Sequence, residues 1–135
     1  MATIHHKVRF EVPPTLQAIR KKVHERMGLP VALGIDGIEP GHQWPEIGEV
    51  RAAGSLECDE AGDSDIDVTV GAKGVRVDVV PGTNLYFRDS VLAALQELGG
   101  HSDHKPGALA TKKWKNLGEP ERAEVVKEIA GPAAG

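Results

Sequence analysis

The sequence predicts an α+β fold: a mostly antiparallel sheet of four or five strands, two main helices on one face, and a C-terminal helical appendage. Two observations lead to this class. Two short stretches around a Gly-flanked turn alternate apolar and polar residues, as the strands of a hairpin do. Two longer stretches repeat apolar residues every three or four positions, as amphipathic helices do. We expect a core domain over residues 1–100 and the appendage over residues 101–135.

The composition is that of a single globular domain. The chain has 135 residues, of which 40% are apolar and only 4% aromatic, so the core must consist mainly of aliphatic side chains. A chain of this length buries roughly 65–70% of its unfolded surface. Cys58 is the single cysteine, so no internal disulfide can form. No apolar run approaches the ~20 residues that span a bilayer. With no signal peptide at the start, we expect a cytoplasmic protein without a membrane partner.

The charges are unevenly distributed. The net charge is −4, yet residues 1–27 are rich in Lys and Arg, and the stretch from Asp36 to Asp67 has Arg51 as its single base. Such asymmetry has two interpretations. Both charged regions are solvated surfaces, or one of them binds a partner, nucleotide or cation.

The N-terminal part predicts a strand and a helix. Residues 7–12 alternate, with Val8, Phe10 and Val12 on one face, and two prolines end the strand. Residues 15–27 then have helical spacing, with an apolar stripe of Leu16, Ile19, Val23 and Met27. Gly28 suits the position that ends such a helix.

Residues 29–48 are the least regular part of the sequence. A short strand is expected at residues 31–33, and a long loop rich in Gly and Pro at residues 34–48. Loops of this length are often functional, but Trp44 within it is expected to cover the hydrophobic core. A strand follows at residues 49–55.

The clearest element is a hairpin of residues 65–70 and 75–80 around Gly-Ala-Lys-Gly. Pairing of Val70 with Val75 puts six β-branched residues on the core face, namely Ile66, Val68, Val70, Val75, Val77 and Val79. A helix is expected at residues 85–98, a short helix with the basic cluster 112–115 at residues 109–117, and a last helix from Pro120 to Gly131.

The opposite face of the hairpin gathers acids. In the predicted register Asp67 lies directly opposite Asp78, and Asp65 lies two residues along the same strand. Opposed like charges destabilise a sheet by up to ~1 kcal/mol. Arg76, on the same face, is one candidate for neutralising them, and a divalent cation such as Mg²⁺, which prefers carboxylate oxygens, is the other.

The acids form part of a longer pattern. Gly54-Ser55, followed after a short spacer by Asp65-Ile-Asp67, and then by Val77-Asp78-Val-Val and a helix from Leu85, resembles the DNA-polymerase-β-like nucleotidyltransferases, in particular their small bacterial branch. The pattern covers roughly residues 49–95. It departs from the family in having no helix between the Asp-x-Asp strand and the third-Asp strand.

The resemblance implies a Mg²⁺- and ATP-dependent transfer of a nucleoside monophosphate to a hydroxyl, in a toxin–antitoxin or similar setting. Asp65 and Asp67 would then bind the metal, and Asp78 would be the third ligand or the base. Gly54 and Ser55 would form a turn against the nucleotide phosphates. Cys58-Asp59 stands where the family has Arg-Gly, which puts an acid near the expected phosphates.

The alternative is a non-catalytic protein-interaction module, such as an immunity protein, antitoxin or adaptor. Its acidic residues 57–67 would attract a basic protein partner, and Arg76 would simply neutralise the opposed acids. Two other motifs are given structural roles. His101 and His104 are expected to lie in a polar loop rather than in a zinc site. Residues 112–115 are expected to lie on a solvated helix face with a buried Trp. Nucleic acid is therefore not an expected partner.

Overall fold

The structure, a computed structural model, describes residues 3–39, 41–61, 64–102 and 104–120. Over these residues the strands are β1 (Ile4–Arg9), β2 (Ala32–Asp36), β3 (Gln43–Trp44), β4 (Gly48–Cys58), β5 (Ser64–Gly71) and β6 (Gly74–Val79). The α-helices are α1 (Leu16–Met27) and α2 (Leu85–Glu97), and short 3₁₀ helices cover Asp59–Ala61, Ala108–Thr111 and Trp114–Asn116. The α+β class predicted from the sequence is confirmed.

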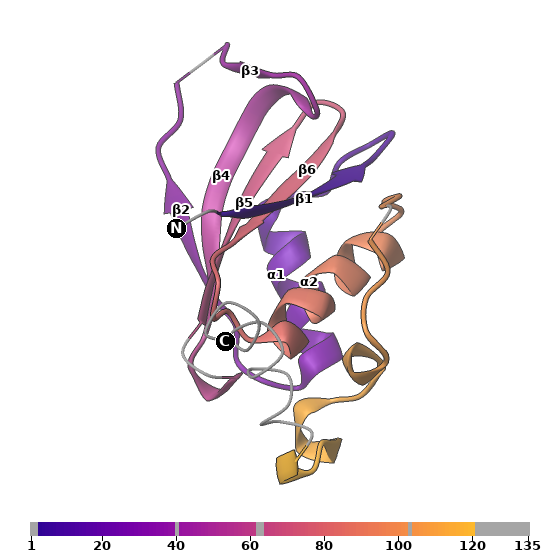
Figure 1. Cartoon of the computed structure of the whole chain (residues 1–135). Coiled ribbons are helices and arrows are strands. Elements are labelled where there is room, and N and C mark those ends of the chain that lie inside the picture. The colour runs from indigo at the N-terminus through magenta and orange to yellow at the C-terminus, as the bar shows by residue number, and fades with distance from the viewer. Residues whose placement is uncertain (1–2, 40, 62–63, 103, 121–135) are drawn as a thin grey trace.

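The sheet is antiparallel throughout its described strands. Its order is β1–β6–β5–β4–β2, and β3 pairs with β4 beside this path. The β5–β6 register is the predicted one, with Asp67 opposite Asp78 and Val70 opposite Val75. Both helices lie on the same side of the sheet (Figure 1).

The core lies between this sheet and the two helices. All six predicted β-branched residues of β5 and β6 are buried, as is the predicted stripe of α1. Tyr86 and Phe87 of α2 are the largest fully buried side chains. Aliphatic side chains supply most of the remaining core, as the scarcity of aromatics requires.

Local sequence sets the limits of both helices. Thr15 caps α1 because its side chain accepts a hydrogen bond from the amide of Ala18, and Gly28 ends the helix at a φ of 69°. Only glycine adopts such a left-handed angle without steric cost. Asn84 caps α2 in the same manner, through the amide of Phe87.

The first strand differs from its prediction. β1 starts at Ile4 and ends at Arg9, three residues before Val12, and Val12 is 84% exposed. The last ladder pair of β1 joins Arg9 to Gly74, where β6 begins at the hairpin turn. The amide of Phe10 still donates to the carbonyl of Lys73 in that turn, and the amide of Arg9 donates to the carbonyl of His101. The expectation that Val12 faces the core is therefore wrong.

The middle of the chain is more regular than predicted. The expected loop of residues 34–48 contains the end of β2 and all of β3, and β4 extends three residues beyond the predicted strand end at Ser55. Neighbours on both edges hold β4 extended, although its Ala-Ala-Gly stretch has weak strand propensity.

The segment after α2 packs onto the core. Ala110 and Leu117 are buried, and the helix expected at residues 109–117 is replaced by two 3₁₀ turns. Of the last predicted helix, residues 121–131 lie outside the described residues.

Candidate functional site

The face of the sheet turned away from the helices carries the predicted acids. Asp65 and Asp67 are exposed on β5, and Asp78 is half-buried on β6. Thr69 pairs with Arg76 at a position between the Asp67–Asp78 pair and the hairpin turn. The structure therefore brings Asp67 and Asp78 together as opposed residues on one face, with Asp65 at the far end of β5.

Asp67 is bonded to a residue of the neighbouring strand. Ser55 lies opposite Asp67 in the β4–β5 ladder, and its Oγ donates a hydrogen bond of 2.8 Å to Asp67 Oδ1. The sequence pattern linked these residues through a bound nucleotide, whereas in the structure they are partners in a sheet.

Gly54 and Ser55 do not form the turn that the resemblance implied. Both lie inside β4, and Gly54 pairs with Ile35 on one side and Val68 on the other. A Cβ atom on Gly54 would lie 2.4 Å from the carbonyl oxygen of Gly34 on β2. The close approach of the β2 and β4 backbones therefore accounts for a glycine here without a ligand.

Asp78 is held by two side chains of its neighbourhood, Arg76 and His5. Arg76 Nε donates to Asp78 Oδ1 at 2.8 Å, and His5 Nδ1 contacts the same oxygen. The Arg76 guanidinium in turn lies 4.4 Å from the centre of the Trp44 ring. Arg76, one of the two candidates for neutralising the acids, is in contact with Asp78. Trp44 was expected to cover the hydrophobic core, whereas in the structure its ring lies against the Arg76 guanidinium.

A lysine reinforces the same face. Lys7 of β1 lies opposite Arg76 in the β1–β6 ladder and forms an ion pair of 3.1 Å with Glu46. The hydrogen bond from Lys7 is the main reason why the pKa of Glu46 is lowered.

Among the described residues, no group of three or more His, Cys, Asp or Glu side chains has the arrangement that holds a metal ion.

A second group of acids lies where β4 passes into the 3₁₀ helix. Glu57, Asp59, Glu60 and Asp65 are exposed, and no ion pair involves them within the described part of the chain. We call these four residues the acidic surface. A hollow of about 250 Å³ lies beside it, lined by Glu57, Asp59, Glu60 and the residues that lead into β2, from Pro30 to Ala32.

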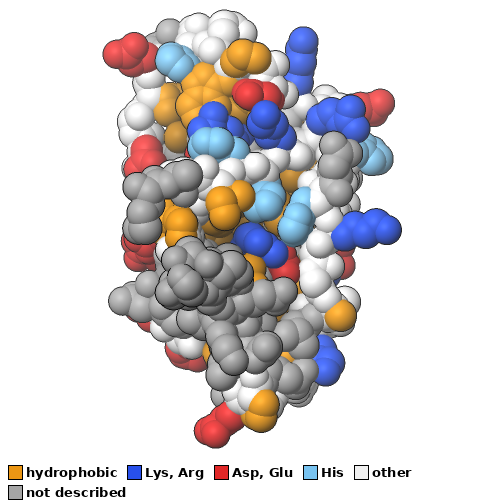
Figure 2. All heavy atoms as spheres, viewed as in Figure 1, with side chains coloured by type: hydrophobic (Ala, Val, Ile, Leu, Met, Phe, Trp, Pro, Cys, Tyr) orange, Lys and Arg blue, Asp and Glu red, His pale blue; other side chains and the backbone are white. Residues whose placement is uncertain are grey.

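A histidine cluster on the helix side was not predicted. Figure 2 shows histidine side chains among Lys and Arg side chains on the face that carries β1. The rings of His6 and His104 lie 4.7 Å apart. Burial, the nearby His104 and the Arg88 charge, in that order, lower the pKa of His6 to about 4. The sequence offered no indication of this pair, because the two histidines meet only through the packing of β1 against the segment after α2.

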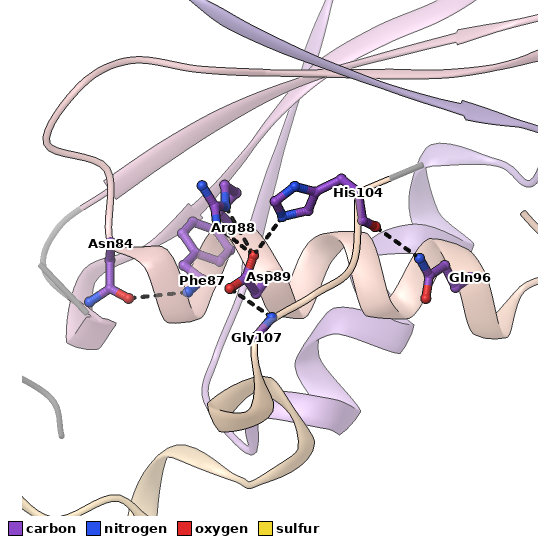
Figure 3. A network of polar contacts seen from close by, with 7 residues as sticks. All are labelled: Asn84, Phe87, Arg88, Asp89, Gln96, His104 and Gly107. Carbon is purple, nitrogen blue, oxygen red and sulfur yellow. Dashed lines mark hydrogen bonds and ion pairs between the residues drawn. The ribbon is translucent and has the colours of Figure 1, made fainter. Parts of the chain in front are cut away.

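Asp89 is the anchor of this cluster (Figure 3). Its buried carboxylate accepts hydrogen bonds from Arg88 Nε at 3.0 Å and from the Gly107 amide at 3.0 Å, and His104 Nε2 lies 3.4 Å from it. His104 is thus part of a packed polar network, and His101 bridges to Arg9 of β1. The bridge between His101 and Arg9 connects the segment after α2 to the sheet.

The basic cluster 112–115 is tied to the core. Trp114 is half-buried and lies 5.3 Å from the ring of Tyr86, whose hydroxyl donates to the Lys112 carbonyl. Burial is the largest cause of the rise in the Tyr86 pKa to about 12. The packed Trp agrees with the structural role expected for this cluster.

No protein-family model, curated protein or solved structure matches this chain. Within the described residues, neither α1 nor α2 has the length and apolar character that a bilayer crossing requires. A functional assignment therefore depends on the geometry of the chain itself.

Proposed function

We propose that this chain is a non-catalytic protein-interaction module whose acidic surface binds a basic segment of a protein partner. The observation that carries the proposal is the contrast between the two sets of acids. Asp78 forms an ion pair with Arg76, contacts His5, and is only 12% exposed at its side chain. The acidic surface, by comparison, is exposed and has no ion-pair partner among the described residues.

The hollow beside the acidic surface gives it shape as well as charge. Its volume suits one long side chain, and its wall from Pro30 to Ala32 offers apolar contact to the stem of a Lys or Arg. Charged surfaces of this kind speed the encounter with a partner of opposite charge and set its orientation. A flexible basic peptide fits these requirements.

The test is binding of a fluorescein-labelled Arg/Lys-rich peptide, followed by anisotropy. Replacement of two acids, Glu57→Gln with Glu60→Gln, should weaken binding about fivefold or more, the factor for about 1 kcal/mol. The matched control is Glu25→Gln with Glu39→Gln, which removes the same charge from exposed positions elsewhere. Equal weakening by both pairs would mean that only net charge matters, and the proposal would fail.

A nucleotidyltransferase activity is the second candidate. It is favoured by one observation: Ser55, Asp67 and Asp78 share a face of the sheet, and Ser55 contacts Asp67 directly. In this proposal Asp65 and Asp67 bind Mg²⁺, Asp78 is the third ligand or the base, and Ser55 contacts the ATP phosphates.

The two candidates respond differently to nucleotide. An enzyme of this kind gains thermal stability when Mg²⁺ and ATP are added together, because ligands that bind the folded state stabilise it. It also labels a partner from α-labelled ATP, and Asp65→Ala with Asp67→Ala abolishes that labelling while the protein stays folded. An interaction module shows no nucleotide-dependent gain in stability.

A further inference from the structure

A groove of about 890 Å³ opens between the N-terminal half of α1 and the end of the sheet that the helices leave uncovered. Its floor is apolar, with Leu16 from α1, Leu33 and Ile35 from β2, and Val70 from β5. Ile35 is 68% exposed, so its side chain is available to a ligand in the groove. This volume lies in the range of pockets that bind ligands.

Two arginines stand in the lining of this apolar groove. Arg20 of α1 donates to the side chain of Gln17 and to the carbonyl of Val31, and neither acceptor carries a charge. Arg51 of β4 is exposed. No ion pair involves either guanidinium within the described part of the chain, and no Asp or Glu lines the groove. Unpaired cations over apolar contacts are complementary to a ligand that has both carboxylates and apolar side chains.

The open edge of β2 indicates what kind of ligand fits. β2 is the last strand in the sheet order, so within the described residues its outer edge pairs with no other strand. Such an edge presents backbone donors and acceptors that an extended peptide can use. Gly34 and Ile35 are both exposed on it, directly beside the groove.

We propose that this groove binds an extended acidic–apolar peptide segment of a partner protein, with its carboxylates on Arg20 and Arg51 and its apolar side chains on Leu33 and Ile35. This site is separate from the acidic surface. The acidic surface lies beside Ala32 at the start of β2, and the groove is lined by Leu33 and Ile35 further along the strand. The chain would then bind partners of opposite charge at two places, as an adaptor does.

The probe is a fluorescein-labelled peptide that alternates Glu or Asp with Leu or Val, and its binding is followed by anisotropy. Two variants test the site: Arg51→Gln removes an exposed cation, and Ile35→Ser removes an exposed apolar contact. Both positions are exposed, so neither change should unfold the protein. Each is expected to weaken binding about fivefold or more, whereas Lys21→Gln, which removes an exposed cation of α1 outside the groove, should leave it unchanged.

Several results would overturn this inference. One is the absence of binding by wild-type protein, and another is equal affinity in the Ile35→Ser variant. A third is equal affinity for a peptide in which Lys replaces every acid, because the arginines would then contribute nothing. Sedimentation identifies the remaining alternative: a concentration-dependent dimer that Ile35→Ser dissociates would mean that a second copy of this chain, rather than a partner peptide, covers the groove.

Discussion

Asp67 and Asp78 face each other across the β5–β6 ladder, and each carboxylate accepts its hydrogen bonds from a different neighbour. Asp67 is bonded by the Ser55 hydroxyl, whereas Asp78 is bonded by the charged Arg76. The two acids are thereby stabilised within the sheet itself. This arrangement leads to the first prediction.

Arg76→Gln should lower the free energy of unfolding by about 1–3 kcal/mol, the range for losing a hydrogen bond to a charged group. The Arg76 side chain is 22% exposed, so water compensates only in part, and its contact with Trp44 is lost as well. Urea unfolding measures the effect, with Arg9→Gln as the control at an exposed position of β1. Adding Asp78→Asn should recover part of the loss. No recovery in the double variant would mean that the ion pair is not the source of the stability.

A second prediction concerns the end of β1. Val8→Ala should cost about 2 kcal/mol, because Val8 is 1% exposed and each buried methyl group contributes about 0.8 kcal/mol before any cavity cost. Val12→Ala should change the free energy of unfolding by less than about 0.5 kcal/mol, as exposed positions do. Equal costs in urea unfolding would restore the strand limits predicted from alternation alone.

A third prediction is a pH dependence from His6. The pKa of His6 is about 4 in the folded protein, against 6.5 as its usual value, so the unfolded chain binds this proton more readily. Stability should therefore fall as the pH drops from about 6.5 to about 4 and lose nothing further from this group below that range. The titratable and charged groups that act on His6 are His104, Arg88, Asp89 and Asp78. Unfolding free energies measured across this range should decline less steeply in His6→Gln, and identical slopes would contradict the prediction.

A fourth prediction concerns the anchor of the post-helix segment. Asp89→Asn removes the charge that Arg88, His104 and the Gly107 amide surround, so it should destabilise the protein by about 1–3 kcal/mol. The backbone amides of His104, Lys105 and Gly107 should exchange with deuterium faster than in the wild type. Asp36→Asn, at an exposed position of β2, is the control. Unchanged exchange at Gly107 would show that the carboxylate does not hold the loop.

Some of this geometry follows from local sequence. The β5–β6 register could be predicted because six alternating β-branched residues leave one pairing that buries them all, and the two glycine-flanked turn residues fix its position. The limits of α1 could be predicted because Thr15 and Gly28 are residue types that end helices. The Thr15 side chain accepts a hydrogen bond from a free backbone amide at the start of the helix, and the Gly28 amide donates to a backbone carbonyl at its end.

Other features depend on packing between distant segments. The exclusion of Val12 from the sheet depends on where the hairpin turn ends the strand that pairs with β1. The His6–His104 pair depends on how β1 meets the loop after α2. Gly54 is an example from the candidate site of a feature that the sequence alone does not predict. Its spacing from Asp65 resembles a phosphate-binding motif, yet its surroundings are the backbone of β2. Spacing along the chain does not show which strand will lie beside it.

The most direct test of the proposed interaction module is an NMR titration of the ¹⁵N-labelled protein, first with the Arg/Lys-rich peptide and then with Mg²⁺ and ATP. The module predicts shift changes at Ala32, Glu57, Asp59 and Glu60 with the peptide, and none at Ser55, Asp67 or Asp78 with Mg²⁺ and ATP. Shift changes gathered at Ser55, Asp67 and Asp78 on adding Mg²⁺ and ATP, with no response to the peptide, would contradict it.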